Sequence, residues 1–138
     1  MSENKDLAKP LPKDIPSLEH SFQFESIGKL TKTRFIGDFT CRIPRIKEQC
    51  LIDKHEAYLN GPNVYTLKPG TLKMHKMIAY LRFALIGDMP KWWKSSDLGY
   101  ELQDLNVIEE VYNKVLEYEN EWIKEIWGED PNSPLNQE

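Results

Sequence analysis

Residues 28–61 read GKLTKTRFIGDFTCRIPRIKEQCLIDKHEAYLNG, and this stretch decides the fold. The alternation of side chains from Thr31 to Ile43 is typical of a strand with one buried face. The same alternation occurs in Ser21–Ile27, and Gly28-Lys29 between the two segments predicts a turn, so we expect a β-hairpin. Gly37, inside the second strand, indicates a bulge. The buried face is expected to carry Phe22, Phe24, Ser26, Thr33, Phe35, Gly37, Phe39 and Cys41.

Three helices are predicted after the hairpin. The first begins at Arg45, after Pro44 has ended the strand, and stops at Asn60-Gly61-Pro62. Its apolar stripe, which we expect to face the core, is Ile46, Cys50, Leu51, Ile52, Ala57 and Tyr58. The second helix, with Thr71 as its N-cap, is apolar nearly all round toward its end and predicts the central core helix. Its stripe is Leu72, Met74, Ile78, Leu81, Phe83, Leu85 and Ile86.

The last helix is expected to start near Asp104 or Asn106, since Asn106 and Glu109 resemble a capping box. Apolar residues then recur at three-four spacing until Gly128 ends the helix. The predicted fold is α+β, an N-terminal β-hairpin packed on three α-helices. We expect one domain over residues 20–128, a flexible proline-rich arm at residues 1–19 and an acidic disordered tail at residues 129–138.

Composition indicates an ordinary soluble protein. The chain has 138 residues, of which 40% are hydrophobic and 29% charged, and no stretch approaches the length of a membrane span. The N-terminus lacks the apolar region of a secretory signal. Cys41 and Cys50 are not in a CxxC pair and are expected to be reduced. Together these features predict a cytoplasmic protein.

Charge is divided unevenly along the chain. Residues 101–138 hold eleven acidic side chains and two lysines, a net charge of −9, so residues 1–100 carry +5 of the total of −4. Such a division favours contact with charged partner proteins, or head-to-tail association of the chain with itself. The alternative interpretation is a solvated acidic helix and a frayed acidic tail.

Catalytic and metal-binding patterns are weak. HEAYL at residues 55–59 lacks the second histidine of a zinc-protease motif, and Cys50, His55 and His75 match no zinc spacing. Cys50 and His55 would point in different directions on a helix, which disfavours a nucleophile–base pair. The chain contains no phosphate-binding glycine motif. We therefore expect no enzyme activity, no catalytic residues, no metal and no cofactor.

Protein binding is the better prediction. Basic and aromatic residues on the hairpin would suit nucleic acid, but the aromatics are needed for the core and the chain is acidic, with a pI of about 5.5. Trp residues are enriched at interface hot spots, although one of a loop pair often closes the core instead. The candidate anchors are Trp92, Trp93, Tyr118, Trp122 and Trp127. The candidate electrostatic docking face is Arg34, Arg42, Arg45 and Lys47.

The order of segments also resembles a family. A strand TRFIGDFTCRIP, a helix ending in LNG, an apolar helix MIAYLRFAL, a Pro-Trp-Trp loop and an acidic helix VIEEVYNKVLEYENEW are similar to small tail-assembly proteins of long-tailed bacteriophages. The resemblance spans residues 28–127. It implies a tail assembly chaperone of the host cytoplasm, which keeps the tape-measure protein soluble, helps recruit tail-tube subunits and is absent from the finished virion. It implies no catalytic residues.

A structural virion protein is the alternative interpretation. A minor capsid, connector or tail component would make subunit contacts through its arm and its divided charge, and it would be found in the virion. The proline-rich arm favours this interpretation, because such segments can become ordered by wrapping a neighbouring subunit.

Overall fold

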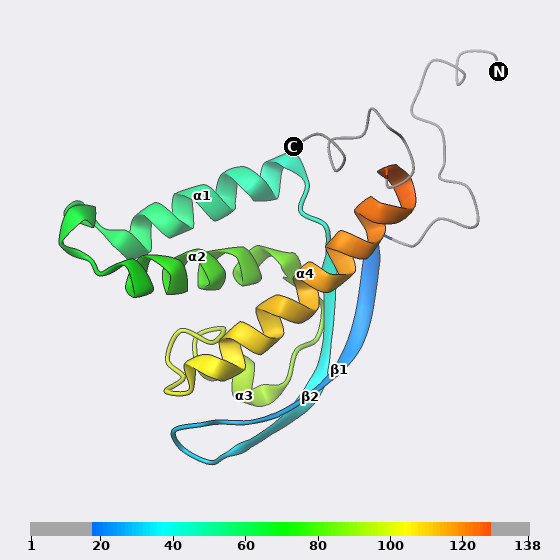
Figure 1. Ribbon diagram of the computed structural model, residues 1–138, viewed down its shortest axis with the longest axis horizontal. Helices are drawn as coiled ribbons and strands as arrows, with labels where there is room; N and C mark the ends of the chain where they lie inside the picture. Colours follow the sequence, from blue (N-terminus) through cyan, green and yellow to red (C-terminus); the bar gives the residue numbers. More distant parts are fainter. Residues whose placement is uncertain (1–17, 128–138) are drawn as a thin grey trace.

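A long β-hairpin forms the sheet on which the helices pack (Figure 1). The computed structural model describes residues 18–127, with side chains up to residue 125. Strand β1 spans Glu19–Ile27, strand β2 spans Arg34–Arg42, and the two pair antiparallel with Phe22 opposite Phe39. The predicted inner face of Phe24, Phe35, Phe39 and Cys41 is buried, so the predicted hairpin and α+β class are confirmed. The predicted arm and tail lie almost entirely outside the described residues.

A third strand, β3, was not predicted. It consists of Leu85–Ile86 and pairs antiparallel with β2, giving the order β1-β2-β3. The expectation that these two residues end the second helix is wrong, because the helix stops at Ala84 and Leu85 takes an extended conformation with φ −84° and ψ 132°. Leu85 is buried against the core, so its apolar character serves a strand rather than a helix.

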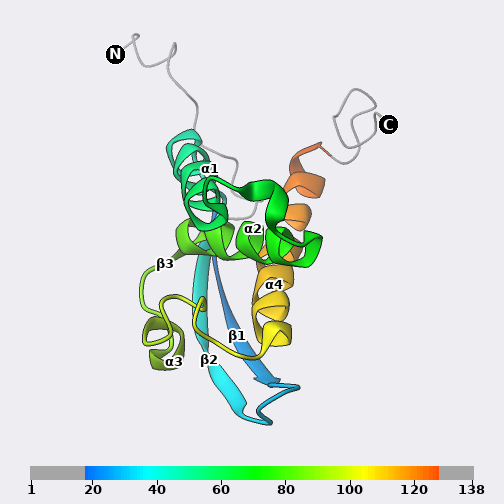
Figure 2. The ribbon, with the colours of Figure 1, turned by 90° about the vertical axis from the view of Figure 1, so that its left-hand side faces the viewer.

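The helices cover one side of the hairpin. Helix α1 is Ile46–Asn60, α2 is Pro69–Ala84, α3 is Lys91–Lys94 and α4 is Leu105–Trp127, with a short 3-10 turn, η2, at Val64–Thr66. Helix α4 contacts β1 and α2, while α1 packs against α2. In both views α2 lies between α1 and α4 (Figures 1 and 2). Helix α2 begins at Pro69, earlier than the predicted N-cap Thr71, because proline suits the first helical position.

The start of α4 holds the hairpin turn. The carboxylate of Asp104 accepts hydrogen bonds from the backbone N–H groups of Leu30 (2.7 Å) and Thr31 (3.0 Å) and from the hydroxyl of Thr31. Asn106 donates to the carbonyl of Ile27 and accepts from the N–H of Lys29. The predicted capping box is therefore wrong, because the amide of Asn106 is used by the hairpin rather than by the helix terminus.

Gly37 allows a close approach rather than a bulge. The β1–β2 register runs without interruption from Glu19 opposite Arg42 to Ile27 opposite Arg34, so the predicted bulge is wrong. A Cβ added at Gly37 would lie 2.2 Å from Cγ of Pro90. The glycine thus lets the segment before α3 press directly on β2.

Replacing Gly37 by alanine is expected to lower the free energy of unfolding by about 1–3 kcal/mol, because the new methyl group must displace the Pro90 ring. Gly70→Ala is the matched control, since a Cβ at Gly70 meets nothing within 4 Å and alanine is the better helix former. Denaturant titration of both variants measures the effect. Equal stabilities would show that the Pro90 contact is easily relieved.

Candidate functional site

The two adjacent tryptophans of α3 belong to the core. Trp93 is fully buried and packs edge-on against Phe39, with ring centroids 5.4 Å apart. Trp92 is half-buried and donates its indole N–H to the carbonyl of Ile36. The prediction of Trp93 as an exposed anchor is wrong, because a short helical turn directs its ring inward.

The aromatic residues of α4 also face inward. Tyr118 is only 6% exposed, and its ring stacks on that of His20 at 4.7 Å. Trp122 is partly buried against the same core cluster. Tyr118 is therefore a core residue, not the predicted anchor, and the side chain of Trp127 lies outside the described side chains.

The predicted basic docking face is engaged in ion pairs within the chain. Arg45 donates to the carboxylate of Glu48 through Nε (2.7 Å), and Arg42 lies 3.8 Å from the same carboxylate. Hydrogen bonding from Arg45 holds the pKa of Glu48 at about 2. Arg34 pairs with Glu25 on the exposed side of the hairpin. Of the four predicted residues, Arg34, Arg45 and Lys47 are exposed, and Arg42 is half-buried.

An apolar surface that was predicted to be core faces outward instead. We define the outer face of α1 as Ile46, Cys50, Ala57 and Tyr58; Ile46 is 86% exposed and Tyr58 77% exposed. At 100° per residue, Ile46, Cys50 and Ala57 lie within about 40° of one another around the helix axis, and Tyr58 lies about 80–120° from them. The opposite side, with Glu48 and Ile52, is the buried one.

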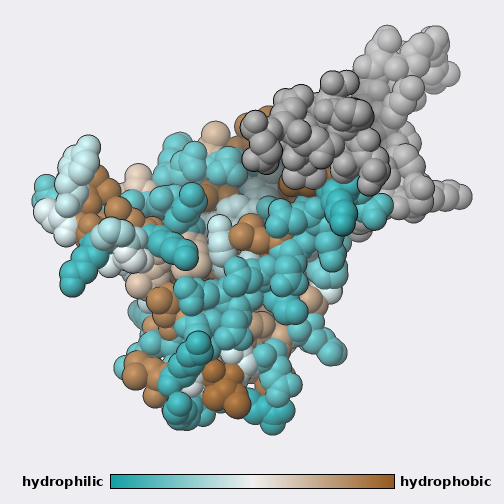
Figure 3. Space-filling model, in the orientation of Figure 1, coloured by the Kyte–Doolittle hydropathy of each residue, from teal (hydrophilic) through white to brown (hydrophobic). Residues whose placement is uncertain are grey.

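The predicted stripe on α1 was wrong for these four residues because the helix carries apolar side chains on both sides. Leu59 and Ile52 pack toward α2, which leaves the second apolar set in solvent. Tyr65, in the turn after α1, is fully exposed. Figure 3 shows apolar surface at that end of the α1–α2 pair and also at the hairpin tip, where Leu30 is 70% exposed.

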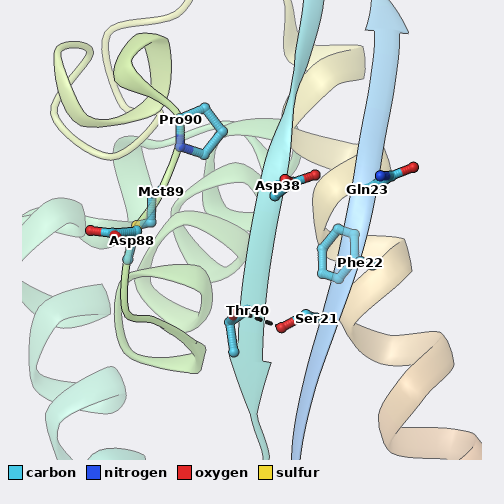
Figure 4. Close-up of a pocket in the computed structure, with 8 residues that line it drawn as sticks. All are labelled: Ser21, Phe22, Gln23, Asp38, Thr40, Asp88, Met89 and Pro90. Carbon is cyan, nitrogen blue, oxygen red and sulfur yellow. Dashed lines mark hydrogen bonds between the residues drawn. The ribbon is translucent and has the colours of Figure 1, made fainter.

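A shallow hollow of about 710 Å³ lies between the hairpin and the loop Asp88–Pro90 (Figure 4). Its polar side chains are the carboxylates of Asp38 and Asp88, the amide of Gln23, and the hydroxyls of Ser21 and Thr40, which bond to each other at 2.8 Å. The hydroxyl of Ser21 thus pairs with another hydroxyl rather than with a base. In residues 18–127 no group of three or more His, Cys, Asp or Glu side chains could hold a metal ion. The carboxylates of Asp38 and Asp88 make the hollow better suited to a cationic group than to an anionic one.

Buried ionisable groups gather between α2, α4 and β2. Burial raises the pKa of Glu119 to about 7, and the hydroxyl of Tyr80 donates to its carboxylate. Burial, followed by the charge of Glu119, raises the pKa of Cys41 to about 11. A thiol with so high a pKa stays protonated at neutral pH and is a poor nucleophile.

Replacing Glu119 by glutamine is expected to stabilise the protein at pH 8 and to have little effect at pH 5. A raised folded-state pKa means that stability falls as pH rises from about 4.5 to about 7, because in this range the unfolded chain releases the proton while the buried carboxyl keeps it. Glutamine avoids this ionisation and still accepts from Tyr80. The free energy of unfolding of Glu119→Gln at pH 8 should exceed that of the wild type by on the order of 1 kcal/mol, since water still screens the carboxyl group. Thermal melts at the two pH values measure it, and an equal effect at both would contradict the assignment.

Comparison of the chain with known proteins identifies no relative. No helix within residues 18–127 is long and apolar enough to cross a membrane. No protein-family model, curated protein or solved structure matches the chain.

Proposed function

We propose that the protein is a non-enzymatic protein-binding factor in bacteriophage tail morphogenesis. It acts as a tail assembly chaperone in the host cytoplasm, where it holds the tape-measure protein and helps recruit tail-tube subunits. The observation that carries the binding role is the outer face of α1. The setting in phage assembly rests on the resemblance of residues 28–127 to small tail-assembly proteins.

The outer face of α1 suits a helical partner. Ile46, Cys50 and Ala57 lie along one line of the helix with Tyr58 to one side, and such an exposed apolar face can pack against a second helix. Burial of Ile46 and burial of Tyr58 against a partner would each contribute about 1.5–3 kcal/mol to the binding free energy. Two such residues do not suffice for a durable complex, because association costs several kcal/mol, so we expect Tyr65 and neighbouring polar residues to contribute as well.

A chaperone leaves the assembled particle, whereas a structural component stays in it. The test is quantitative mass spectrometry of purified virions and of infected-cell lysate from the phage that encodes this chain. We expect the protein in the lysate, in complex with the tape-measure protein, and not in virions. Stoichiometric copies in virions would overturn the chaperone proposal and favour a minor capsid, connector or tail component.

A further inference from the structure

Strand β1 forms one edge of the sheet, and half of its backbone N–H and C=O groups point away from its neighbour β2. In an antiparallel pair, alternate residues direct their N–H and C=O groups toward the partner strand and away from it. Ile43 donates to the carbonyl of Leu18, and Gly28 donates to that of Thr33, so the even-numbered residues of β1 face β2. The backbone groups of Ser21, Gln23 and Glu25 therefore point away from β2. The next carbonyl that points away from β2, that of Ile27, accepts a hydrogen bond from the side-chain amide of Asn106.

The far side of β2 is covered, in contrast. The indole of Trp92 binds the carbonyl of Ile36, and β3 pairs with Thr40 and Cys41. Pro90 lies against Gly37 between these two contacts. A long uncovered edge strand is a template for pairing with another chain, and most proteins protect such edges. Within residues 18–127, the fold protects β2 and leaves the middle of β1 uncovered.

Three hollows meet at Gln23 of β1. The hollow of about 710 Å³ lies on the outer face of the hairpin, and a second of about 350 Å³ adjoins it there. A third, of about 360 Å³, lies between β1 and α4. The ionisable residues that line them are the acids Glu25, Asp38, Asp88, Glu110 and Glu117 and the single base Lys114. Near the β1 edge the acids are therefore Glu110 and Glu117 on the α4 side and Asp38 on the outer face, whereas Glu25 pairs with Arg34 and Asp88 lies beyond β2 (Figure 4).

We propose that the β1 edge receives an extended, basic segment of a partner protein as an added strand. The backbone of the segment would pair with Ser21, Gln23 and Glu25. Its side chains would alternate between the wall of α4, which holds Glu110 and Glu117, and the outer-face hollows near Asp38. The site lies apart from the outer face of α1 and does not depend on the chaperone role.

A second copy of this chain fits the edge less well than a basic segment. Pairing of β1 with β1 of another copy would place two α4 walls along one groove. Each wall contributes Glu110 and Glu117, so like charges would face each other across a short distance. The charge of the groove therefore favours a basic occupant.

The test uses labelled seven-residue peptides and fluorescence anisotropy on the full chain. The probe alternates threonine and arginine. One control alternates threonine and glutamate, and a second alternates proline and arginine, which keeps the charge but removes half of the N–H donors. We expect the Thr–Arg peptide to bind about tenfold more tightly than the Pro–Arg peptide, the ratio that a lost backbone hydrogen bond or two produces. Equal binding of these two peptides would mean attraction by charge alone and would overturn the proposal.

Gln23→Pro tests the edge itself, with Gln23→Ala as its matched control. Proline at Gln23 removes an N–H that points away from β2, so the β1–β2 ladder keeps its hydrogen bonds. We expect Gln23→Pro, but not Gln23→Ala, to lose about tenfold in affinity for the Thr–Arg peptide. If Gln23→Pro fails to fold, Glu117→Lys replaces it, and the Thr–Arg peptide should then bind more weakly. Unchanged binding of the Thr–Arg peptide by the folded variants would overturn the proposal. So would a wild-type dimer that excludes the peptide and that Gln23→Pro abolishes, because the edge would then bind a second copy of the chain.

Discussion

Replacing Trp93 by alanine is expected to lower the free energy of unfolding by about 3–5 kcal/mol, the usual range for removing a fully buried large aromatic side chain. The loss is large because the ring joins several parts of the core. Trp93 packs edge-on against Phe39 of β2 and against Trp92. Gly99 lies so close that a Cβ there would be 2.7 Å from the indole. The cavity left by alanine is therefore bounded by groups that cannot easily collapse into it.

Two further variants make the Trp93 prediction specific. Trp93→Phe should lower the free energy of unfolding much less than Trp93→Ala. It keeps an aromatic ring and removes an indole N–H that has no hydrogen-bond partner among the described residues. Tyr65→Ala, at a fully exposed ring, should leave the stability unchanged. Urea titration followed by circular dichroism measures all three. A Trp93→Ala protein as stable as Tyr65→Ala would place Trp93 outside the core.

Replacing Asp104 by asparagine is expected to produce the second-largest loss, a fall of several degrees in the thermal midpoint at pH 7. The carboxylate receives two backbone N–H groups and the Thr31 hydroxyl, and an amide in its place would turn N–H donors toward those same donors. The hairpin turn would then lose its attachment to α4. Melting at pH 7, with Glu101→Gln as an exposed control, measures the effect.

The Asp104 effect should also depend on pH. Hydrogen bonding from Thr31 holds the pKa of Asp104 below its usual value of 3.8. A lowered folded-state pKa stabilises the fold above the unfolded-state value, and the contribution is lost as pH falls through the folded-state pKa. Wild type and Asp104→Asn should therefore converge in stability at low pH. A difference that is constant from pH 7 to pH 2 would show that the carboxylate charge is not what holds the turn.

The hairpin could be predicted because its signal is local. Alternation through Phe22, Phe24, Phe35 and Phe39 fixes which face is buried, and one glycine-led turn brings the two halves together. The last helix was predictable for the same reason, since its apolar stripe repeats over more than five turns. In both the hairpin and α4, many residues follow the hydrophobic period, so one residue that departs from it does not change the prediction.

The candidate site was not predictable, because it depends on which neighbour each surface meets. Helix α1 has apolar residues on two sides, and only the position of α2 decides that Ile52 is buried and Ile46 exposed. Trp93 and Tyr118 resembled interface anchors, but packing drew both rings into the core. The covering of the far side of β2 likewise follows from contacts such as Trp92 with Ile36, which join residues far apart in the chain.

If the chain acts in tail assembly as proposed, co-expression with the tape-measure protein of its phage tests whether the outer face of α1 holds a helical partner. Wild-type protein should keep the tape-measure protein soluble and elute with it as one complex. The double variant Ile46→Asp and Tyr58→Asp should fold normally, since both side chains are exposed, and should lose the complex. Gln49→Ala, at an exposed polar position of the same helix, should retain it. A soluble complex that survives the double substitution would contradict the claim.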